Sequence, residues 1–381
     1  MRVVILAGSV PITTFIDALI NVMAEEGLKM TIIGKRTGHF KYHKNVDVVL
    51  VPSNRPGQFL FIIKNIVRCR LKDIKKIFDS SAGIVGFFYD LLFYLPIINA
   101  KPDKIHIQWA AILHGHDLLF DLFPDKILLS LRGAHINYKP ITHPEIKETY
   151  IKLFPEIHRF HAVSNDIGME ALKYAAAKGK IQTIYSYVDD EIVNIDISPK
   201  EKGLLKIISV GRFIWIKGYD YALDALGILK QRKVDFEYTI VAQGTIPDSI
   251  IFQIDQLGLK DNVIIVNGLA HNEVIKKIKE SDLLLLSSLD EGVANVALEA
   301  MAVGTPVITT DCGGMDEVII NNVSGIIVNN RDSAAMADAL GVFNEMTPEE
   351  RYSLALAAKK RIRDFHNKSL FVKEFSAFYK L

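Results

Sequence analysis

Short apolar runs separated by amphipathic segments dominate the hydrophobic pattern of the chain, most clearly in its second half. Continuous apolar runs of this kind are typical of parallel strands that are buried on both faces. They predict strands at 238–241, 263–267, 283–286 and 307–310. The segments between them have helical periodicity and predict helices that include 271–280 and 294–302. Strands that recur about every 25 residues with helices between them indicate a parallel α/β sheet.

The first half of the chain begins with the same pattern. An apolar strand at 3–7 ends in Gly8-Ser9, and a helix that Thr13 or Thr14 could cap leads to a second strand. Further strands are expected at 103–109 and 126–131. The first apolar run is too short for a signal peptide. The Gly-x-Gly-x-x-Gly fingerprint of nicotinamide enzymes is absent after the first strand, which argues against a dehydrogenase.

Length and composition favour two such domains. The chain has 381 residues, 49% of them hydrophobic, which suits two domains of about 180 residues with a core each. A formal net charge of +1 argues against general binding of nucleic acid. The two cysteines, Cys69 and Cys312, are interpreted as reduced packing residues of a cytosolic protein. No spacing of metal ligands is visible.

A charged segment at 185–206 that contains Pro199 is typical of an exposed connector between domains. It divides the chain into a predicted N-terminal domain at 1–190 and a C-terminal domain at 205–365. The segment 366–381 ends in an aromatic, amphipathic helix that we expect to cross back to the N-terminal domain.

Charged residues gather next to the strand ends of the second domain. Glu291 lies in the loop after one strand, and Glu299 lies about two turns into the next helix. Arg212 and Lys217 stand in the glycine-containing loop after another strand, where two cations suit a pyrophosphate. The simpler interpretations are that the carboxylates only favour the helix dipole and that the cations are ordinary surface residues.

Several residues in this order resemble a known family, the retaining nucleotide-sugar glycosyltransferases of family 4. These enzymes have the GT-B architecture, an α/β fold of two Rossmann-like parallel-sheet domains facing a cleft. The resemblance rests on Gly211-Arg212, Lys217-Gly218, Glu291-Gly292, Asn295, Glu299-Ala300-Met301-Ala302, Gly304, Pro306-Val307, Asp311, Gly313-Gly314 and Glu317. The strand end Ala162-Val163-Ser164 and the segment Tyr187-Val188-Asp189 match weaker parts of the family pattern.

The resemblance implies roles for residues in the second domain. Arg212 and Lys217 would neutralise the diphosphate leaving group, and Glu291 would hold sugar hydroxyls near the reacting carbon. Glu299 would accept hydrogen bonds from the ribose. Further donor contacts are expected from the loop and helix start after Glu291 and from two glycines that follow strands; these residues are Gly292, Val293, Ala294, Asn295, Gly211 and Gly244.

The chain departs from the family pattern at two places. One glycine is missing at Ala242-Gln243-Gly244, which weakens the expected contact to base or ribose. In the N-terminal domain Arg132 replaces the family's cleft histidine and His135 replaces the following aspartate, so the role of that histidine cannot be transferred. Arg132 and His135 remain candidates for the acceptor side by position, together with Gly8 and Ser164.

The predicted activity is transfer of a hexose-type sugar, with retention, from a nucleoside-diphosphate sugar such as a UDP-sugar to a glycan or lipid-linked acceptor. The resemblance suggests bacterial polysaccharide or lipopolysaccharide biosynthesis, without metal or other cofactor. A sugar-nucleotide 2-epimerase of the same architecture, a phosphorylase-type enzyme and a non-catalytic sugar-binding protein are the alternatives. The sequence does not select the sugar, the base, the acceptor or the oligomeric state.

A basic segment in the first domain indicates a possible partner of a different kind. Residues 55–76 combine seven Lys or Arg with one Asp and an apolar face, and the apolar run 85–100 follows. A basic amphipathic helix of this type can bind anionic lipid. The alternative is a core helix with a solvated basic face. The prediction is a cytoplasmic protein with peripheral attachment to the inner face of the membrane.

Overall fold

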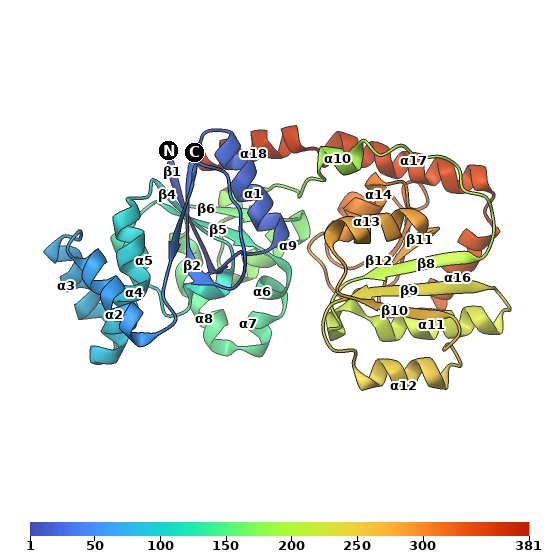
Figure 1. Ribbon diagram of the computed structural model, residues 1–381, viewed down its shortest axis with the longest axis horizontal. Coiled ribbons are helices and arrows are strands. Elements are labelled where there is room, and N and C mark those ends of the chain that lie inside the picture. The colour runs from blue at the N-terminus through green and yellow to red at the C-terminus, as the bar shows by residue number, and fades with distance from the viewer. Residues whose placement is uncertain (381) are drawn as a thin grey trace. The chain divides into compact units, whose positions relative to one another are not determined.

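The computed structural model describes residues 1–380, which form two compact units (Figure 1). The first unit contains Met1–Ile184 and the chain from Val372 onward, and the second contains Tyr185–Phe371. Each unit is built on one parallel sheet, as the recurrence of apolar strands predicts.

The first unit has a seven-stranded sheet in the order β3-β2-β1-β4-β5-β6-β7. Its strands are β1 (Arg2–Val10), β2 (Lys29–Arg36), β3 (Val46–Leu50), β4 (Lys104–Ile107), β5 (Ile127–Leu131), β6 (Arg159–Ala162) and β7 (Ile181–Thr183). Its α-helices are α1 (Thr14–Glu25), α2 (Arg55–Ile66), α3 (Leu71–Ser80), α4 (Gly83–Ala100), α5 (Leu118–Leu122), α6 (Gly133–Asn137), α7 (Lys139–Thr142), α8 (Pro144–Leu153) and α9 (Asn165–Ala171). Single 3-10 turns are η1 (Ala110–Leu113), η2 (Phe154–Glu156), η3 (Leu172–Tyr174) and η4 (Lys178–Lys180).

The last helix, α18 (Lys368–Lys380), packs on one face of this sheet through a chain of buried hydrogen bonds. The hydroxyl of Tyr379 lies 2.7 Å from Nδ1 of His106 on β4, and Nε2 of His106 lies 2.8 Å from the hydroxyl of Ser130 on β5. Ser130 in turn lies 2.8 Å from Nδ1 of His161 on β6. These side chains alternate with the apolar residues that face the other side of the sheet, so the period of a strand brings all three onto the face below α18.

The second unit has a six-stranded sheet in the order β10-β9-β8-β11-β12-β13. Its strands are β8 (Leu205–Val210), β9 (Phe236–Ala242), β10 (Val263–Asn267), β11 (Leu283–Leu286), β12 (Val307–Thr310) and β13 (Ile326–Val328). The helices α11 (Tyr219–Gln231), α12 (Asp248–Gln256) and α16 (Ser333–Glu345) cover one face, and α13 (His271–Glu280), α14 (Asn295–Ala302) and α17 (Pro348–Phe365) cover the other. Shorter elements are α10 (Asp190–Val193), η5 (Trp215–Lys217) and α15 (Met315–Val318).

Several predicted elements are confirmed to the residue, among them the strand at 283–286, the strand at 307–310 and the helix at 271–280. The expected side-chain cap of α1 is wrong, because Thr13 occupies the N-cap position without a side-chain hydrogen bond and its buried Oγ1 has no partner. The segment 185–204 is also less exposed than its charge suggests. Val188 and Val193 are buried in the second unit, and Lys200 donates to the carbonyl of Ser281.

Candidate functional site

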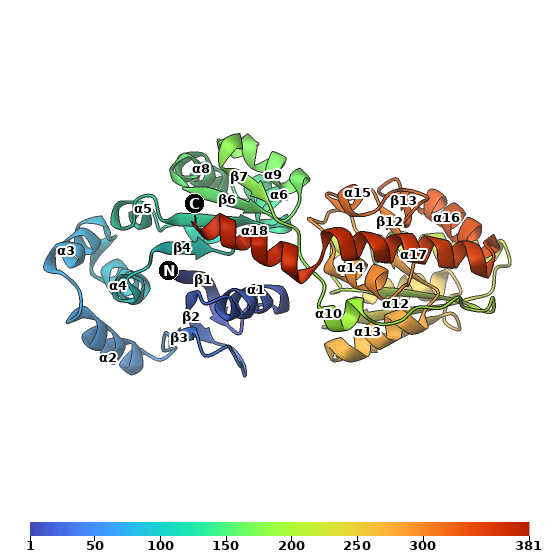
Figure 2. The ribbon, with the colours of Figure 1, turned by 90° about the horizontal axis from the view of Figure 1, so that it is seen from above.

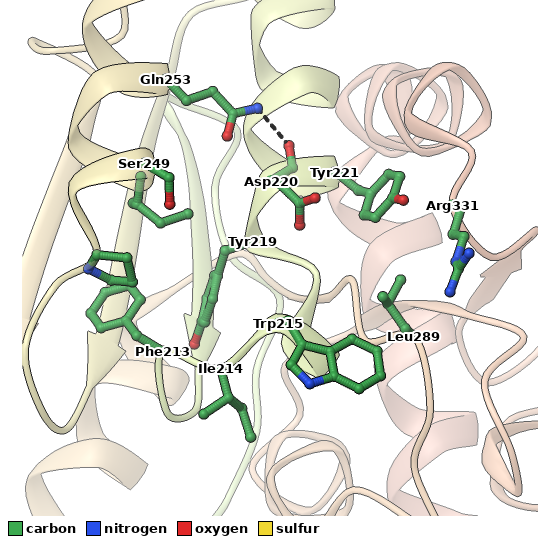
Figure 3. Close-up of a pocket in the computed structure, with 12 residues that line it drawn as sticks. Phe213, Ile214, Trp215, Tyr219, Asp220, Tyr221, Ser249, Gln253, Leu289 and Arg331 are labelled. Atoms are coloured by element: carbon green, nitrogen blue, oxygen red, sulfur yellow. Dashed lines mark hydrogen bonds between the residues drawn. The ribbon is translucent and has the colours of Figure 1, made fainter. Parts of the chain in front are cut away.

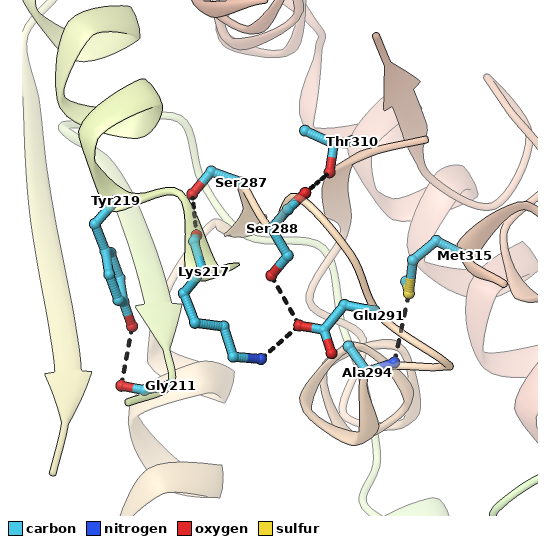
Figure 4. Close-up of polar contacts among 9 residues, drawn as sticks. All are labelled: Gly211, Lys217, Tyr219, Ser287, Ser288, Glu291, Ala294, Thr310 and Met315. Carbon is cyan, nitrogen blue, oxygen red and sulfur yellow. Dashed lines mark hydrogen bonds and ion pairs between the residues drawn. The ribbon is translucent and has the colours of Figure 1, made fainter. Parts of the chain in front are cut away.

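In the second unit, the loops that follow β8 and β11 bring two predicted site residues into contact (Figure 4). The ammonium group of Lys217 forms an ion pair with the carboxylate of Glu291, although the two residues are 74 positions apart. Their side chains are only 19% and 15% exposed, and Ser288 donates a 2.8 Å hydrogen bond to the same carboxylate oxygen. A partly desolvated cation beside a carboxylate at the carboxyl edge of a parallel sheet is an arrangement suited to polar substrates.

Two glycines explain why the loops can approach so closely. A Cβ atom on Gly218, which has φ +58°, would lie 2.2 Å from the carbonyl oxygen of Ser287. A Cβ atom on Gly313, which has φ +55°, would lie 1.7 Å from the carbonyl oxygen of Glu291. Both positions combine a left-handed backbone with a contact that leaves no room for any side chain. The backbone of the Glu291 loop therefore passes between these two glycines.

Glu299, the second predicted carboxylate, has a partner that the sequence did not indicate. His271, the first residue of α13, places Nε2 2.8 Å from Oε1 of Glu299. The hydrogen bond to Glu299 is the main cause that raises the pKa of His271. His271 follows β10, so it lies at the same carboxyl edge of the sheet as Glu299. This position after a strand was the only feature of the sequence that could have indicated a role for His271 in the site.

The remaining predicted donor residues lie at the same edge. Arg212 is exposed and its guanidinium has no hydrogen-bond or ion partner among residues 1–380. Gly211 directly follows β8, and its carbonyl accepts a 3.0 Å hydrogen bond from Tyr219. Gly244 follows β9 with φ +105°. Residues 292–295 lead into α14, where the amide of Gly314 donates to the carbonyl of Gly292 and the amide of Ala294 faces the sulfur of Met315.

A cavity of about 580 Å³ opens beside the loop that follows β8, on the side of α11 and α12 (Figure 3). Phe213, Trp215 and Tyr219 line it, with Asp220 and Arg331 as its charged members. The sequence analysis did not single out this cavity, because its walls come from four separate segments.

In the first unit, Arg132 lies at the end of β5 in a setting with little solvent. Its Nη2 donates to the side-chain oxygen of Gln108 at 3.0 Å, and its guanidinium lies 4.7 Å from the ring centre of Phe15. Burial lowers the pKa of Arg132 to about 9. Nε of Arg132 and Nε2 of the fully buried Gln108 have no hydrogen-bond partner within residues 1–380. Buried donors without partners are uncommon and costly, so they mark a place where a ligand could supply acceptors.

The other first-unit candidates differ in what they contact. His135 stacks on Trp109 with ring centres 5.0 Å apart, and burial lowers the pKa of His135 to about 4. Its Nδ1 is buried without a partner. Ser164 is fully buried and caps α9 by accepting a 3.2 Å hydrogen bond from the amide of Ile167, so its hydroxyl already has a structural role. Gly8 has φ +85° near the end of β1.

Within residues 1–380, no group of three or more His, Cys, Asp or Glu side chains is placed to hold a metal ion. In the part of the chain that the structure describes, one helix, α4, is long and apolar enough to cross a membrane by length and composition, and a third of it is buried within the fold.

The fold is that of the GT-B glycosyltransferases. Sucrose-phosphate synthase from Thermosynechococcus elongatus superposes with a TM-score of 0.77 at 14% identity, covering 100% of this chain and 98% of that one. The Anabaena protein Alr3699/HepE in complex with UDP gives a TM-score of 0.72 at 13% identity over the full length of both chains. These likenesses confirm the predicted fold class.

Comparisons of sequence agree with this class. Residues 190–361 match the family described as "Glycosyl transferases group 1". The amylovoran biosynthesis glycosyltransferase AmsK of Erwinia amylovora is 29% identical over 253 residues, which are 64% of this chain and 62% of AmsK. The putative colanic acid biosynthesis glycosyltransferase WcaL of Escherichia coli K12 is 30% identical over 179 residues, 45% of this chain and 44% of WcaL. The chain thus matches less than two thirds of the length of either relative, and both comparisons support a GT-B glycosyltransferase.

Proposed function

We propose that this chain is a retaining glycosyltransferase of family 4 that transfers a sugar from a nucleoside-diphosphate sugar to a glycan or lipid-linked acceptor. The relatives AmsK and WcaL are named for the biosynthesis of amylovoran and of colanic acid. Polysaccharide biosynthesis is therefore the process that we propose for this chain. The observation that carries the proposal is the partly desolvated pair Lys217–Glu291 beside the unpaired Arg212 at one sheet edge.

Two cations near a strand-to-helix loop supply what the departing diphosphate needs. Negative charge builds on the leaving phosphate as the bond to the sugar breaks, and fixed cations stabilise that charge most where water is scarce. Arg212 offers a planar fork of donors and Lys217 offers a compact charge. Amides at 292–295, around the start of α14, would add further donors for the phosphate or the sugar. The protein therefore supplies the positive charge, and we propose that no metal takes part.

Lys217 must exchange partners when a diphosphate binds. Its charge is balanced by Glu291 in the structure. A diphosphate that binds Lys217 leaves the carboxylate of Glu291 free to accept hydrogen bonds from the sugar and to stabilise positive charge at the reacting carbon. Glu299 would likewise exchange its hydrogen bond with His271 for hydrogen bonds donated by the ribose hydroxyls. We assign no covalent nucleophile, because retention by a front-face mechanism needs none.

Residues of the first unit would bind the acceptor. Arg132, Gln108 and His135 carry buried nitrogens without partners, and hydroxyl or anionic groups of the acceptor could satisfy them. Gly8 and Ser164 remain candidates for the acceptor site because of their positions in the chain. We further propose a cytoplasmic location with peripheral attachment to the membrane through the basic residues of 55–76.

A titration of the purified protein with UDP, GDP and ADP, followed by calorimetry, tests the donor site. We expect saturable binding of one diphosphate, and Lys217→Ala should weaken it by about 100-fold because a charge-assisted contact is lost. Lys276→Ala is the matched control, since Lys276 forms only an exposed ion pair on α13. If no diphosphate binds, or if both variants behave alike, the proposed donor site is wrong.

The alternatives are separated by product analysis. A 2-epimerase would convert the sugar nucleotide without any acceptor, which NMR of the donor alone would detect. A sugar-binding protein would bind the sugar and release no diphosphate over time. Transfer that requires an added acceptor excludes both.

A further inference from the structure

The cavity of about 580 Å³ in the second unit takes no part in the proposed transfer, although it lies beside the loop that follows β8. The helices that border it, α11 and α12, lie on the opposite face of the sheet from α14 and α17 (Figures 1 and 2). Its volume is within the range of about 300–1,000 Å³ that is usual for ligand sites. None of the four charged residues assigned to the donor lines it; these are Arg212, Lys217, Glu291 and Glu299.

Aromatic side chains form much of the cavity wall. The rings of Phe213 and Tyr219 lie with their centres 5.2 Å apart, and the hydroxyl of Tyr219 donates a 3.0 Å hydrogen bond to the carbonyl of Gly211. Trp215 lies between Tyr219 and Leu289 in the view of Figure 3, and 62% of its surface is exposed. An exposed aromatic ring beside a cavity offers a flat apolar surface to a ligand.

Two opposite charges line the same cavity and do not form an ion pair with each other. Arg331 is exposed, and its guanidinium has no hydrogen-bond or ion partner among residues 1–380. Asp220, at the start of α11, is also exposed, and its carboxylate has no partner in the described chain. Gln253 contacts only the backbone carbonyl of Asp220, at 2.9 Å. The cavity therefore presents hydrogen-bond donors and acceptors that the fold itself does not use.

The backbone at Arg331 is held in an uncommon conformation. Its φ is +60°, which is rare for a residue with a side chain and is found most often at functional sites. The side-chain amide of Asn330 donates a 2.7 Å hydrogen bond to the carbonyl of Leu289. The backbone amide of Leu289 donates a 2.7 Å hydrogen bond to the carbonyl of Ile216, in the aromatic loop. These bonds connect three parts of the cavity wall, so little ordering is needed when a ligand binds.

The combination of rings and charges selects the chemistry of the ligand. A purely apolar ligand would bury Asp220 and Arg331 without partners, which is costly. An anionic ligand would be repelled by Asp220 and a cationic ligand by Arg331. A neutral sugar suits both residues, because its hydroxyl groups donate to the carboxylate and accept from the guanidinium. Its C–H faces also pack against aromatic rings.

We propose that this cavity binds a neutral segment of a glycan chain, at a place separate from the donor contacts. Phe213 and Trp215 would pack against the sugar rings, and Asp220 and Arg331 would form hydrogen bonds with the hydroxyl groups. The use of the site rests on the proposed glycosyl transfer. A transferase that holds part of a long glycan here keeps its acceptor bound between transfers, because attachment at a second place raises the effective concentration of the reacting end.

Fluorescence of Trp215 tests the site directly. In the variant Trp109→Phe, Trp215 is the single tryptophan of the chain. The probes are three neutral trisaccharides, maltotriose, cellotriose and galactotriose. At least one of them should give a saturable shift of the emission to shorter wavelength, because a sugar that covers the exposed indole removes water from it. Calorimetry with the unchanged protein repeats the measurement. No saturable response to any of the three probes would overturn the proposal.

Two variants, measured by calorimetry with the probe that binds, locate the binding in this cavity. Arg331→Ala should weaken it by about tenfold, the effect of losing one hydrogen bond to a charged group. Arg363→Ala, which removes an exposed arginine of α17, is the matched control. Ser249→Trp, which fills the cavity from the start of α12, should abolish binding, and Ser353→Trp, at an exposed position of α17, should keep it.

Thermal unfolding checks that each of these variants is folded. Binding that Arg331→Ala and Ser249→Trp leave unchanged would overturn the assignment to this cavity.

The donor site is tested separately with nucleoside diphosphates. If a diphosphate binds and no trisaccharide does, the proposed transfer stands and the glycan site is wrong. If a trisaccharide binds in this cavity and no diphosphate binds, the glycan site stands and the proposed transfer is wrong.

Discussion

In the second unit, two carboxylates near the strand ends are each paired with a basic side chain, whereas Arg132 at a strand end of the first unit has no carboxylate partner among the described residues. Lys217 meets Glu291 and His271 meets Glu299 at the edge of the second sheet. The corresponding edge of the first sheet has an apolar cavity, and the buried histidines of its central strands bond to hydroxyls. Two sheets of the same plan therefore differ in the chemistry at their edges, because strand ends and loops set the chemistry while the strands set the frame.

The largest expected effect comes from Gly313→Ala, which breaks the loop packing of the second unit. The new Cβ would overlap the carbonyl of Glu291, and the backbone would remain in a left-handed conformation. We expect the free energy of unfolding to fall by about 3 kcal/mol and diphosphate binding to be lost. Thermal unfolding and calorimetry measure both. Gly203→Ala is the control, since a Cβ there meets no atom within 4 Å. Equal stability of the two variants would contradict this account.

Glu291→Gln separates the two members of the ion pair. Removal of the carboxylate frees Lys217, so the affinity for nucleoside diphosphate should rise about threefold. Transfer should fall about 100-fold because the sugar loses its charged acceptor. Calorimetry gives the first value and steady-state release of diphosphate gives the second. Glu280→Gln, which removes an exposed partner of Lys276, should change neither. A parallel loss of affinity and rate would show that Glu291 orders the loop without opposing the diphosphate.

Acid should destabilise the first unit more than the second. Burial lowers the pKa of His161 to about 3, that of His135 to about 4 and that of His106 well below its usual value. Between these values and about 6.5 the unfolded chain binds more protons, so the free energy of unfolding falls as the pH drops below 6.5. The loss approaches about 1.4 kcal/mol per pH unit for each histidine.

In the second unit, the pKa values of two histidines are shifted in opposite directions. Burial lowers the pKa of His366 to about 4, but the pKa of His271 is raised, which stabilises the fold at low pH and is lost as the pH rises through the folded value. The chain has two tryptophans, one in each unit, so Trp215→Phe leaves Trp109 to report on the first unit and Trp109→Phe leaves Trp215 for the second. Between pH 7.5 and pH 5.5, the midpoint of urea unfolding reported by Trp109 should decrease more than the midpoint reported by Trp215. Equal shifts would show that the buried histidines do not set the acid response.

The smallest effect is expected from His271→Gln. Protonated His271 holds Glu299, so the affinity of the unchanged protein for its sugar nucleotide should rise about threefold as the pH increases through the raised pKa of His271. The variant should lack this rise and bind with the higher affinity at pH 6. Calorimetry between pH 6 and pH 8.5 measures the difference. An identical pH profile for both proteins would remove His271 from the donor site.

The apolar pattern predicted the strands well because local periodicity is enough to define them. The strand at 263–267 and the helix at 271–280 agree with the structure, and both contain runs whose period is unambiguous. The cap at Thr13 failed although Thr13 is the N-cap residue, because its hydroxyl is buried and makes no hydrogen bond among the described residues. The connector predicted at 185–206 is exposed at most of its charged residues, but the pattern did not reveal the buried Val188 and Val193.

The charged site could be predicted only in part. Glu291, Glu299, Arg212 and Lys217 were found because they follow strands at recognisable spacings. His271 was missed, although it begins a helix after a strand, because nothing local links it to Glu299, 28 residues away. The cavity between α4 and the ends of β1 and β2 was missed as well, because its walls come from two strands, two α-helices, the turn η1 and loops that are far apart in sequence.

The sequence by itself determined the two parallel sheets, the residues at their carboxyl edges and the basic, apolar character of 55–89, because strand period, glycine positions and charge are local properties. Only the tertiary structure decided that Lys217 is held by Glu291, that Arg132 is half-buried without a carboxylate partner among the described residues, and that side chains of α4 line a cavity. These outcomes depend on which strands are neighbours and on how far each helix is covered. Both are set by packing between segments that lie tens of residues apart, where local pattern carries no information.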